Sequence, residues 1–164
     1  MGIDAASDSR NYPDRASHEY WDDRSLIVRA NQVPWTPWAL EGTYFKLLDY
    51  SRNHSYFVFL LKIDASAPRA MHKHIGAANA YILQGGFSYE KGGVREGDFF
   101  VEAGGIDHAP ETDPDGCILL GFSNGAVAGY NNDGSIAGVV DVDWMVEQAK
   151  ANKAFDHLSK ARRS

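Results

Sequence analysis

The chain has 164 residues, 44% of them apolar and 23% charged, a composition typical of one folded domain and unlike that of a disordered or fibrous protein. Sixteen basic residues against 22 acidic ones give a formal net charge of −6, so we expect no nucleic-acid partner, because nucleic-acid backbones are also negative. The longest strictly apolar run, residues 56–61, is far shorter than the roughly 20 residues of a membrane-spanning helix, so we expect no membrane span.

The N-terminal residues have neither the basic flank nor the apolar stretch of a secretory signal, and this predicts a cytoplasmic protein. The one cysteine, Cys117, excludes an internal disulfide and fits the same compartment. It lies in the apolar segment 117–120, which indicates a buried thiol rather than a nucleophile.

Residues 1–24 are polar and acidic, and we expect them to form an N-terminal arm on the surface. From residue 25 to residue 142, short apolar segments alternate with Gly, Pro, Asn and Asp, as in antiparallel β domains. The expected strands are residues 26–30, 44–50, 55–64, 70–74, 79–84, 87–89, 98–102, 107–109 and 117–124. These nine short strands predict a β-sandwich or a β-barrel.

Three segments of this β domain carry further expectations. Segment 55–64 is apolar at both sets of alternate positions, so we expect a central strand that is covered on both faces. Segment 35–38, with two tryptophans around a proline, is expected to cover a sheet edge or to join a dimer interface, and a ligand gate is the weaker alternative. Tyr81 and Phe87 flank a glycine turn and either form an apolar wall of a pocket or pack in the core.

The C-terminal part of the sequence changes to a helical pattern. Segment 132–134, Asn-Asp-Gly, predicts a hairpin turn, because these residue types accept a positive φ. Asp143 is placed to cap a helix that runs to about residue 158. We expect residues 143–164 to form a C-terminal helix packed on the barrel of residues 25–142.

Three of the six histidines have a spacing that suits metal binding. His72 and His74 are two residues apart, and on a strand such residues project from the same face, so both imidazoles can reach one ion. His108 follows a predicted strand and a glycine turn that can bring a third imidazole beside them. Three imidazoles on a β scaffold suit Fe, Zn, Ni or Cu and leave coordination positions open. The alternative is that these are ordinary histidines on exposed strand faces.

The glycines around these histidines complete a pattern that resembles the two sequence motifs of the cupin family. The matching positions are His72, His74 and Gly86 in the first motif and Gly97, Gly105 and His108 in the second. The chain departs from the second motif at Ala103, where proline is usual, and at Thr112, where asparagine is usual. The glutamate of the usual cupin metal site would fall at Asn79 or Ala78, so the resemblance implies an all-histidine ligand set.

The resemblance implies an all-β fold, a cupin-type double-stranded β-helix or jelly-roll barrel with a C-terminal α-helix. The chain looks most like the branch that contains the acetylacetone-cleaving dioxygenase and the 2,4'-dihydroxyacetophenone dioxygenase. Those cupins hold non-haem iron with three histidines and cleave a C–C bond of a ketone with both atoms of O2. A second relative is the zinc-binding cupin domain of bacterial anti-sigma factors. The resemblance also implies a homodimer or a higher homo-oligomer.

An all-histidine site favours a particular substrate chemistry. Neutral imidazoles leave a divalent ion its full charge, which stabilises anionic chelators such as an enolised β-diketone or α-hydroxyketone. We therefore expect a non-haem dioxygenase that acts on such a ketone and O2, with Fe(II) as the functional metal and Zn or Ni as alternative bound metals. Glu102 is expected either to hold a metal ligand or a water by a hydrogen bond, or to be a solvated rim residue. The alternatives are an isomerase or lyase that needs no O2, and a non-catalytic zinc-binding or ligand-sensing domain.

Overall fold

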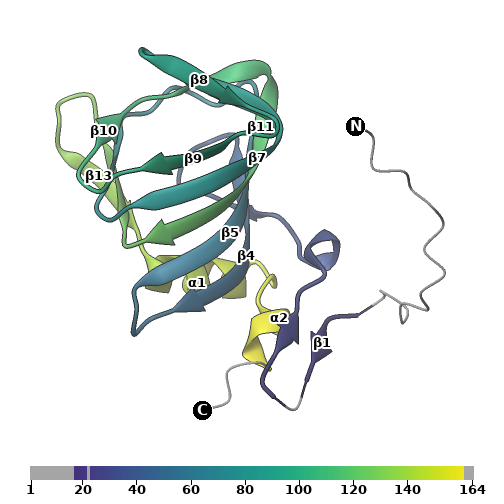
Figure 1. Cartoon of the computed structure of the whole chain (residues 1–164). Helices are drawn as coiled ribbons and strands as arrows, with labels where there is room; N and C mark the ends of the chain where they lie inside the picture. The colour runs from purple at the N-terminus through teal and green to yellow at the C-terminus, as the bar shows by residue number, and fades with distance from the viewer. Residues whose placement is uncertain (1–16, 22, 161–164) are drawn as a thin grey trace, which may run out of the picture.

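The computed structural model describes residues 17–21 and 23–160, and these form a β domain with two short helices at the C-terminal end (Figure 1). In chain order the elements are β1 (Glu19–Tyr20), β2 (Leu26–Ile27), the 3-10 turn η1 (Ala30–Gln32), β3 (Thr36–Pro37), β4 (Thr43–Ser51), β5 (Tyr56–Ile63), β6 (His72–His74), β7 (Ala78–Tyr89), β8 (Gly92–Arg95), β9 (Phe99–Glu102), β10 (Asp107–His108), β11 (Glu111–Asn124), β12 (Val127–Tyr130), β13 (Ile136–Val140), α1 (Val142–Ala151) and α2 (Asp156–Ser159). The expected all-β fold with a C-terminal helix is confirmed.

Two antiparallel sheets make up the β domain. The large sheet has the order β3-β4-β5-β11-β7-β8, with β9 also paired to β7, and the small sheet has the order β10-β6-β12-β13. In Figure 1 the strands of both sheets curve around a common interior, and α1 lies across the end near β4 and β5. Strands β3 and β4 pair at one edge of the large sheet, so segment 35–38 covers an edge as expected.

The inner face of the large sheet changes from bulky to small side chains between β5 and β7. Phe57 and Phe59 on β5 are buried, and across the sheet they face small residues of β11 and β7, which are Ser123, Gly121, Ala78 and Ala80. A Cβ at Gly121 would lie 2.6 Å from the Phe59 ring, so only glycine leaves this ring its place. The small side chains leave space inside the β domain that large residues would otherwise fill.

Strand β5 is central, because it pairs with β4 on one side and with β11 on the other. The expectation that both of its faces are covered is wrong for the described chain. Phe57 is fully buried on the inner face, whereas Val58 and Leu60 on the outer face are only partly buried. Ala30 and Trp35 cover the neighbouring strand β4 on this outer face, where Lys46 is only 7% exposed, but Val58 and Leu60 keep partial contact with solvent.

The C-terminal helix differs from its expectation in two respects. Asp141, not Asp143, caps α1, because its side chain accepts a hydrogen bond from the Trp144 amide at 2.8 Å. The helix also ends earlier than residue 158, since Lys153 takes a φ of +56° and turns the chain into the separate helix α2. Met145 and Val146 are fully buried against the core, so α1 packs on the β domain.

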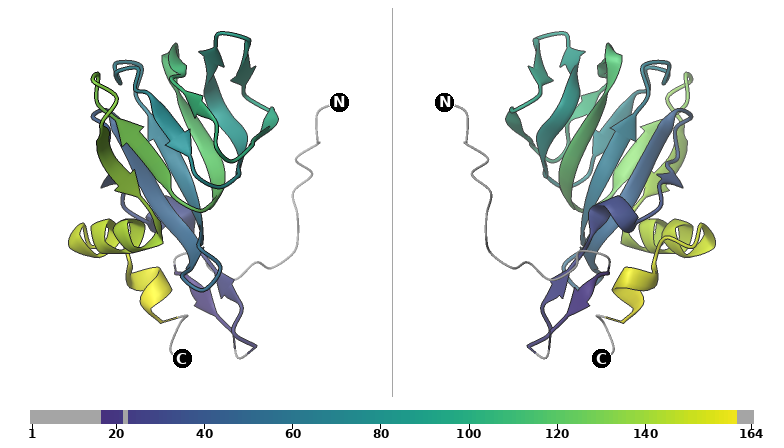
Figure 2. Two further views of the ribbon diagram at one scale, coloured as in Figure 1. Left: turned by 90° about the vertical axis from the view of Figure 1, so that its left-hand side faces the viewer. Right: turned by 90° about the vertical axis from the view of Figure 1, so that its right-hand side faces the viewer.

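The described end of the predicted N-terminal arm is hydrogen-bonded to the C-terminal segment. Strands β1 and β2 pair with each other, and the Tyr20 hydroxyl donates to the carbonyl of His157 at 2.7 Å. Figure 2 shows this hairpin beside α2 at one end of the molecule. The first 16 residues of the predicted arm lie outside the described residues. Among the helices that are described, none has the length and apolar character needed to cross a membrane.

Candidate metal centre

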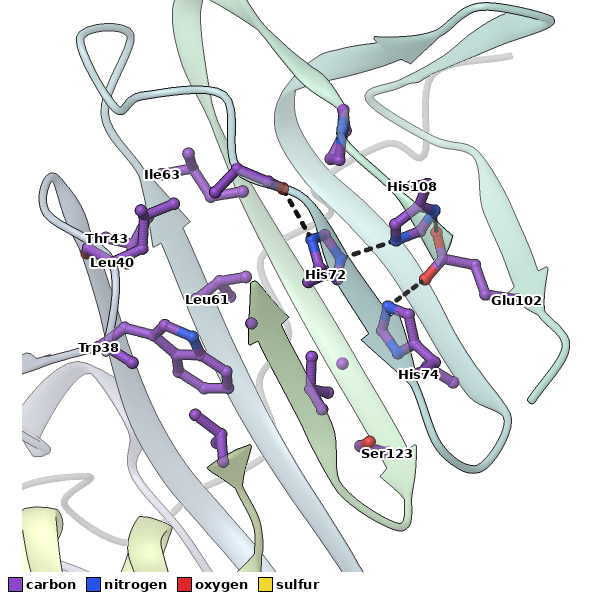
Figure 3. Close-up of a pocket in the computed structure, with 18 of the residues that line it drawn as sticks. Trp38, Leu40, Thr43, Leu61, Ile63, His72, His74, Glu102, His108 and Ser123 are labelled. Atoms are coloured by element: carbon purple, nitrogen blue, oxygen red, sulfur yellow. Dashed lines mark hydrogen bonds and ion pairs between the residues drawn. The ribbon is translucent and has the colours of Figure 1, made fainter. Parts of the chain in front are cut away.

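The three histidines singled out by their spacing meet on the small sheet. His72 and His74 lie on β6, and His108 on β10 pairs directly with His72. The chain reaches β10 through a turn in which Gly105 takes a φ of +83° and donates its amide to the His74 carbonyl at 2.7 Å. One ring nitrogen of each histidine lies within 4.8 Å of the others. Figure 3 shows the three rings converging at one side of a pocket.

The hydrogen bonds of two rings define which nitrogens are free. His72 Nδ1 donates to the Ala70 carbonyl at 3.2 Å, and His108 Nδ1 lies 3.3 Å from Glu102 Oε1. In neutral rings with protonated Nδ1 atoms, both Nε2 atoms carry lone pairs. These two Nε2 atoms face each other at 2.7 Å. Two lone pairs so close repel each other unless a cation or a proton lies between them.

Burial favours the neutral form of two of these imidazoles, His72 and His108. Desolvation lowers the pKa of His72 to about 4, and the neighbouring His108 adds to this effect. Desolvation also lowers the pKa of His108, against the opposing influence of the Glu102 carboxylate. Neutral rings have the lone pairs that a metal ion requires.

Glu102 joins the cluster from the neighbouring sheet. Its Oε2 accepts a hydrogen bond from His74 Nε2 at 3.0 Å, and the side chains of Glu102, His74 and His108 are each only 12% exposed. Burial raises the pKa of this carboxyl, but hydrogen bonds from His74 and Tyr89 outweigh burial and hold the pKa below its ordinary value. Glu102 is therefore an ionised carboxylate beside two of the rings, and not a solvated rim residue.

The structure also decides which residue stands at the usual glutamate position. Ala78 is buried on the inner face of β7 and pairs directly with Glu102 of β9. Asn79 follows on the opposite face, as the alternation along β7 requires. Ala78 therefore occupies the position, and the carboxylate near the histidines comes from the adjacent strand.

Tyr89 is a site residue that the sequence reasoning missed. Its hydroxyl donates to Glu102 Oε1, and its ring stacks on His108 with centroids 5.1 Å apart and an interplanar angle of 24°. Tyr89 thus fixes both the carboxylate and one imidazole. A tyrosine at a strand end gives no sequence signal for such a contact, because the contact depends on how β7 and β9 pair.

The donor set fits a divalent transition metal. Nitrogens bound at right angles to one ion at about 2.0–2.1 Å are about 2.9 Å apart, close to the 2.7 Å between the facing Nε2 atoms. Imidazole nitrogens are ligands for Fe, Zn, Ni and Cu, and a metal-binding histidine commonly donates its other N–H to a carboxylate or a carbonyl. His72 and His108 have such partners in Ala70 and Glu102.

The histidines form one wall of a cavity of about 330 Å³. The far wall contains Trp38, Leu40, Leu61 and Ile63, which Figure 3 shows opposite the histidines. Among the described lining residues Glu102 is the only carboxylate, and there is no lysine or arginine. Away from the histidine wall the described lining is therefore uncharged and mostly apolar, with Thr43, Thr112 and Ser123 among its polar members.

The aromatic residues named from the sequence divide between the two faces of the large sheet. Phe87 is buried in the hydrophobic core and also lines the cavity, so both alternatives hold for it. Tyr81 is 42% exposed on the outer face, so it forms no part of that wall. Trp38 reaches the cavity from the edge segment and stacks on Phe59 with centroids 5.4 Å apart. Cys117 is buried, as expected.

The model of one protein family, described as the ChrR cupin-like domain, matches residues 23–128 of the chain. The chain belongs to this family. The match includes all three histidines and Glu102, and it confirms the resemblance to cupins on which the expected fold depends. No curated protein matches the chain.

Solved cupin structures share the fold at low sequence identity. An RmlC-like cupin from Ralstonia eutropha has 20% identity and a TM-score of 0.70, over 78% of this chain and 87% of that chain. A proposed acetylacetone dioxygenase from Methylibium petroleiphilum has 20% identity and a TM-score of 0.67, over 75% and 92% of the two chains. An acetylacetone dioxygenase from Acinetobacter johnsonii has 16% identity and a TM-score of 0.63, over 90% and 99%. At these identities the similarity concerns the fold.

Proposed function

We propose that this chain is a non-haem, metal-dependent dioxygenase that cleaves a C–C bond of a small enolisable ketone, a β-diketone or an α-hydroxyketone. Fe(II) held by His72, His74 and His108 is the proposed functional metal. The observation that carries the proposal is the meeting of three imidazoles at one wall of a cavity whose remaining described lining, apart from Glu102, is uncharged and mostly apolar. The acetylacetone dioxygenases that share the fold add support from their chemistry.

The charges of the metal site and of the cavity lining favour a substrate with a single negative charge. Because the described lining contains no lysine or arginine, the cavity has no partner for a phosphate or a second carboxylate of a ligand. A divalent ion on three histidines and the adjacent Glu102 carboxylate together carry a charge of about +1, which the single negative charge of an enolate balances. The volume of about 330 Å³ is at the lower end of the range for small-molecule pockets, as a small ketone requires.

The protein's own residues have definable tasks in this reaction. Bound metal supplies Lewis-acid polarisation of the ketone oxygens. Glu102 is the only carboxylate of the described lining, so it is the base for the proton that a ketone loses on enolisation. Tyr89 holds that carboxylate in place, and the apolar wall around Trp38 excludes water from the enolate. In the overall reaction one C–C bond breaks and both atoms of O2 enter the products.

The test is reconstitution of the metal-free protein with Fe(II) under anaerobic conditions, followed by oxygen-electrode measurements on a panel of β-diketones and α-hydroxyketones. We expect one O2 consumed for each ketone cleaved. The matched control is a His72→Ala, His74→Ala variant treated in the same way, which should consume none. Zinc or nickel in a purified sample leaves the proposal standing, since hosts load metals by availability and affinity.

Two other results would overturn the proposal in favour of a defined alternative. Loss of the ketone without O2 uptake would indicate an isomerase or lyase that uses the metal to stabilise an enolate. No turnover of any ketone, with Fe(II) shown to be bound, would indicate a non-catalytic metal-binding domain. The second alternative is supported by the family itself, whose description names ChrR rather than an enzyme.

A further inference from the structure

Trp38 lies at the boundary between the cavity and the hydrophobic core. Its indole contacts Phe45 of β4 and Trp144 of α1 in edge-to-face arrangements, with ring centroids at distances of 5.6 Å and 5.8 Å. Trp38 lines the cavity, whereas Phe45 and Trp144 are not among its described lining residues. The indole therefore closes the cavity on the side of the core.

Contacts from three elements fix the position of this indole. The backbone amide of Trp38 donates to the Thr43 carbonyl at 2.9 Å, where β3 pairs with β4. The indole also stacks on Phe59 of β5, with an interplanar angle of 29°. Together with the edge contacts to β4 and α1, this stacking holds the ring in one place, because closely packed rings leave little free space. Trp38 is therefore a rigid wall of the cavity.

The three histidines lie across the cavity from Trp38 (Figure 3). A chelating ligand that binds a metal ion at the histidines must therefore extend its remaining part toward the far wall. Leu61 and Ile63, which belong to that wall with Trp38, are aliphatic. Such a wall favours an apolar substituent, because a buried polar group would lack a hydrogen-bond partner there.

We propose that Trp38 is the specificity-determining residue of this cavity, because its indole ends the apolar space opposite the metal and limits the length of the substituent on a bound ketone. That the ligand is a ketone enolate rests on the proposed function, whereas the length limit is a property of the cavity itself. The preferred substrate then has two chelating oxygens at one end and a short, uncharged, apolar substituent at the other.

Alkyl hydroxamates test the length limit without any turnover. They bind as singly charged chelators and hold a divalent ion through two oxygen atoms, as an enolate does. Isothermal titration calorimetry on the zinc-loaded full chain measures the affinity for a series that lengthens by one methylene group at a time. We expect the affinity of the parent to rise about fourfold with each methylene and to stop rising at the length at which the chain meets the indole.

Two variants of Trp38 move the wall. In Trp38→Ala the affinity should continue to rise for about two further methylenes, because the removed ring leaves space that is continuous with the cavity. Trp38→Phe keeps a smaller aromatic ring at this position, so it should give a smaller shift in the same direction. It also tests the proposal if Trp38→Ala does not fold, which circular dichroism and thermal unfolding detect. The shortest hydroxamate should bind both variants as it binds the parent, since the metal end is unchanged.

Trp35 provides the matched control within the same segment. The Lys46 Nζ atom lies 4.7 Å from the centroid of its ring, and Trp35 is not among the described lining residues of the cavity. Trp35→Ala therefore removes an indole of the same size without changing the far wall. This variant should show the same length limit as the parent.

The outcomes distinguish the role of Trp38 from the proposed dioxygenase activity. An affinity that rises without a limit in the parent, or a limit that is the same in the parent and the folded Trp38 variants, would overturn the proposal. A limit that moves equally in Trp35→Ala would also overturn it. A parent that shows the limit with hydroxamates but does not oxidise ketones would overturn the proposed function and leave the role of Trp38 supported. No binding of any hydroxamate to the zinc-loaded chain would overturn both, since no chelator would then reach the metal from the cavity.

Discussion

At the scale of single residues, the defining feature is the pair of Nε2 lone pairs that face each other across 2.7 Å. Replacing a histidine removes one ligand, and the remaining imidazoles hold a divalent ion far less tightly. We expect a His72→Ala, His74→Ala variant to fold and to lose nearly all bound metal. The exposed His54 provides the control, because His54→Ala should leave the metal content unchanged.

Metal content is measured by elemental mass spectrometry after dialysis against a weak chelator, with circular dichroism to confirm folding. Full metal occupancy in the double variant would show that these nitrogens are not the ligands. Loss of metal in His54→Ala as well would point to a general effect on stability.

The sequence allowed the histidine cluster to be predicted but not all of its surroundings. His72 and His74 are linked by strand periodicity, which is a local pattern. His108 lies 34 residues further along the chain, and the resemblance to the cupin motifs was what joined it to the pair. The role of Glu102 could not be decided from the sequence. Its position on a strand does not show whether the side chain faces the histidines or the solvent. Tyr89 could not be predicted, because its contact with Glu102 spans 13 residues and depends on the pairing of two strands.

At the scale of elements, the carboxylate of the site lies on β9, beside the position on β7 where the usual cupin metal site has its glutamate. Ala78 stands directly opposite Glu102 on the inner face. An Ala78→Glu variant would place a second carboxylate beside the histidines, which adds a possible ligand and, with the Glu102 carboxylate counted, lowers the net charge of a divalent site from about +1 to 0. We expect the variant to retain metal more strongly and to bind an enolate several-fold more weakly.

The magnitude follows from Coulomb's law. Unit charges 4 Å apart interact by about 4 kcal/mol at an effective dielectric constant of about 20. Even if solvent screening removes most of this energy, the affinity for an enolate should still change several-fold. Ala78→Gln controls for side-chain size without charge, and Asn79→Glu controls for charge on the opposite face. Chelator competition and calorimetry with acetylacetone on the zinc-loaded variants measure both effects. Equal enolate affinity in Ala78→Glu and Ala78→Gln would show that site charge does not govern recognition.

Strands were easier to predict than the elements around them. The long apolar strands β4, β5 and β11 lie near their expected positions, because side-chain alternation is a local signal. The expected strands 79–84 and 87–89 form one strand, since Gly85, at a φ of +65°, bends β7 without ending it. The C-terminal helix was expected to be continuous because Lys153 is not a residue type that usually signals a left-handed turn.

At the scale of the whole molecule, His157 joins the two ends of the described chain. It is 3% exposed, its Nε2 donates to the Leu47 carbonyl of β4 at 2.7 Å, and its ring lies 5.2 Å from the His18 ring. Burial lowers the pKa of His157; the hydrogen bond to Leu47 and nearby Asp156 oppose this effect, and His18 reinforces it. The folded protein therefore keeps this imidazole neutral at pH values where the unfolded chain protonates it.

This difference makes stability depend on pH in a defined direction. Below the unfolded pKa of about 6.5, the unfolded state binds a proton that the folded state does not, so the free energy of unfolding decreases as the pH falls. The decrease attributable to His157 is at most about 1.4 kcal/mol per pH unit, and it stops once the pH is below the lowered folded pKa. In His157→Gln, whose amide can still donate to Leu47, this component should be absent.

Urea unfolding of the parent and His157→Gln at several pH values between neutrality and pH 5 tests the linkage. The stability of the parent should fall more steeply than that of the variant, and the gap should open below the unfolded pKa. His18 shares part of the effect, because burial and the charges of Arg29 and Lys160 lower its pKa too, so the variant keeps some slope. His54→Gln, at an exposed position, should follow the parent. Parallel curves for the parent and His157→Gln would show that this buried imidazole does not couple folding to protons.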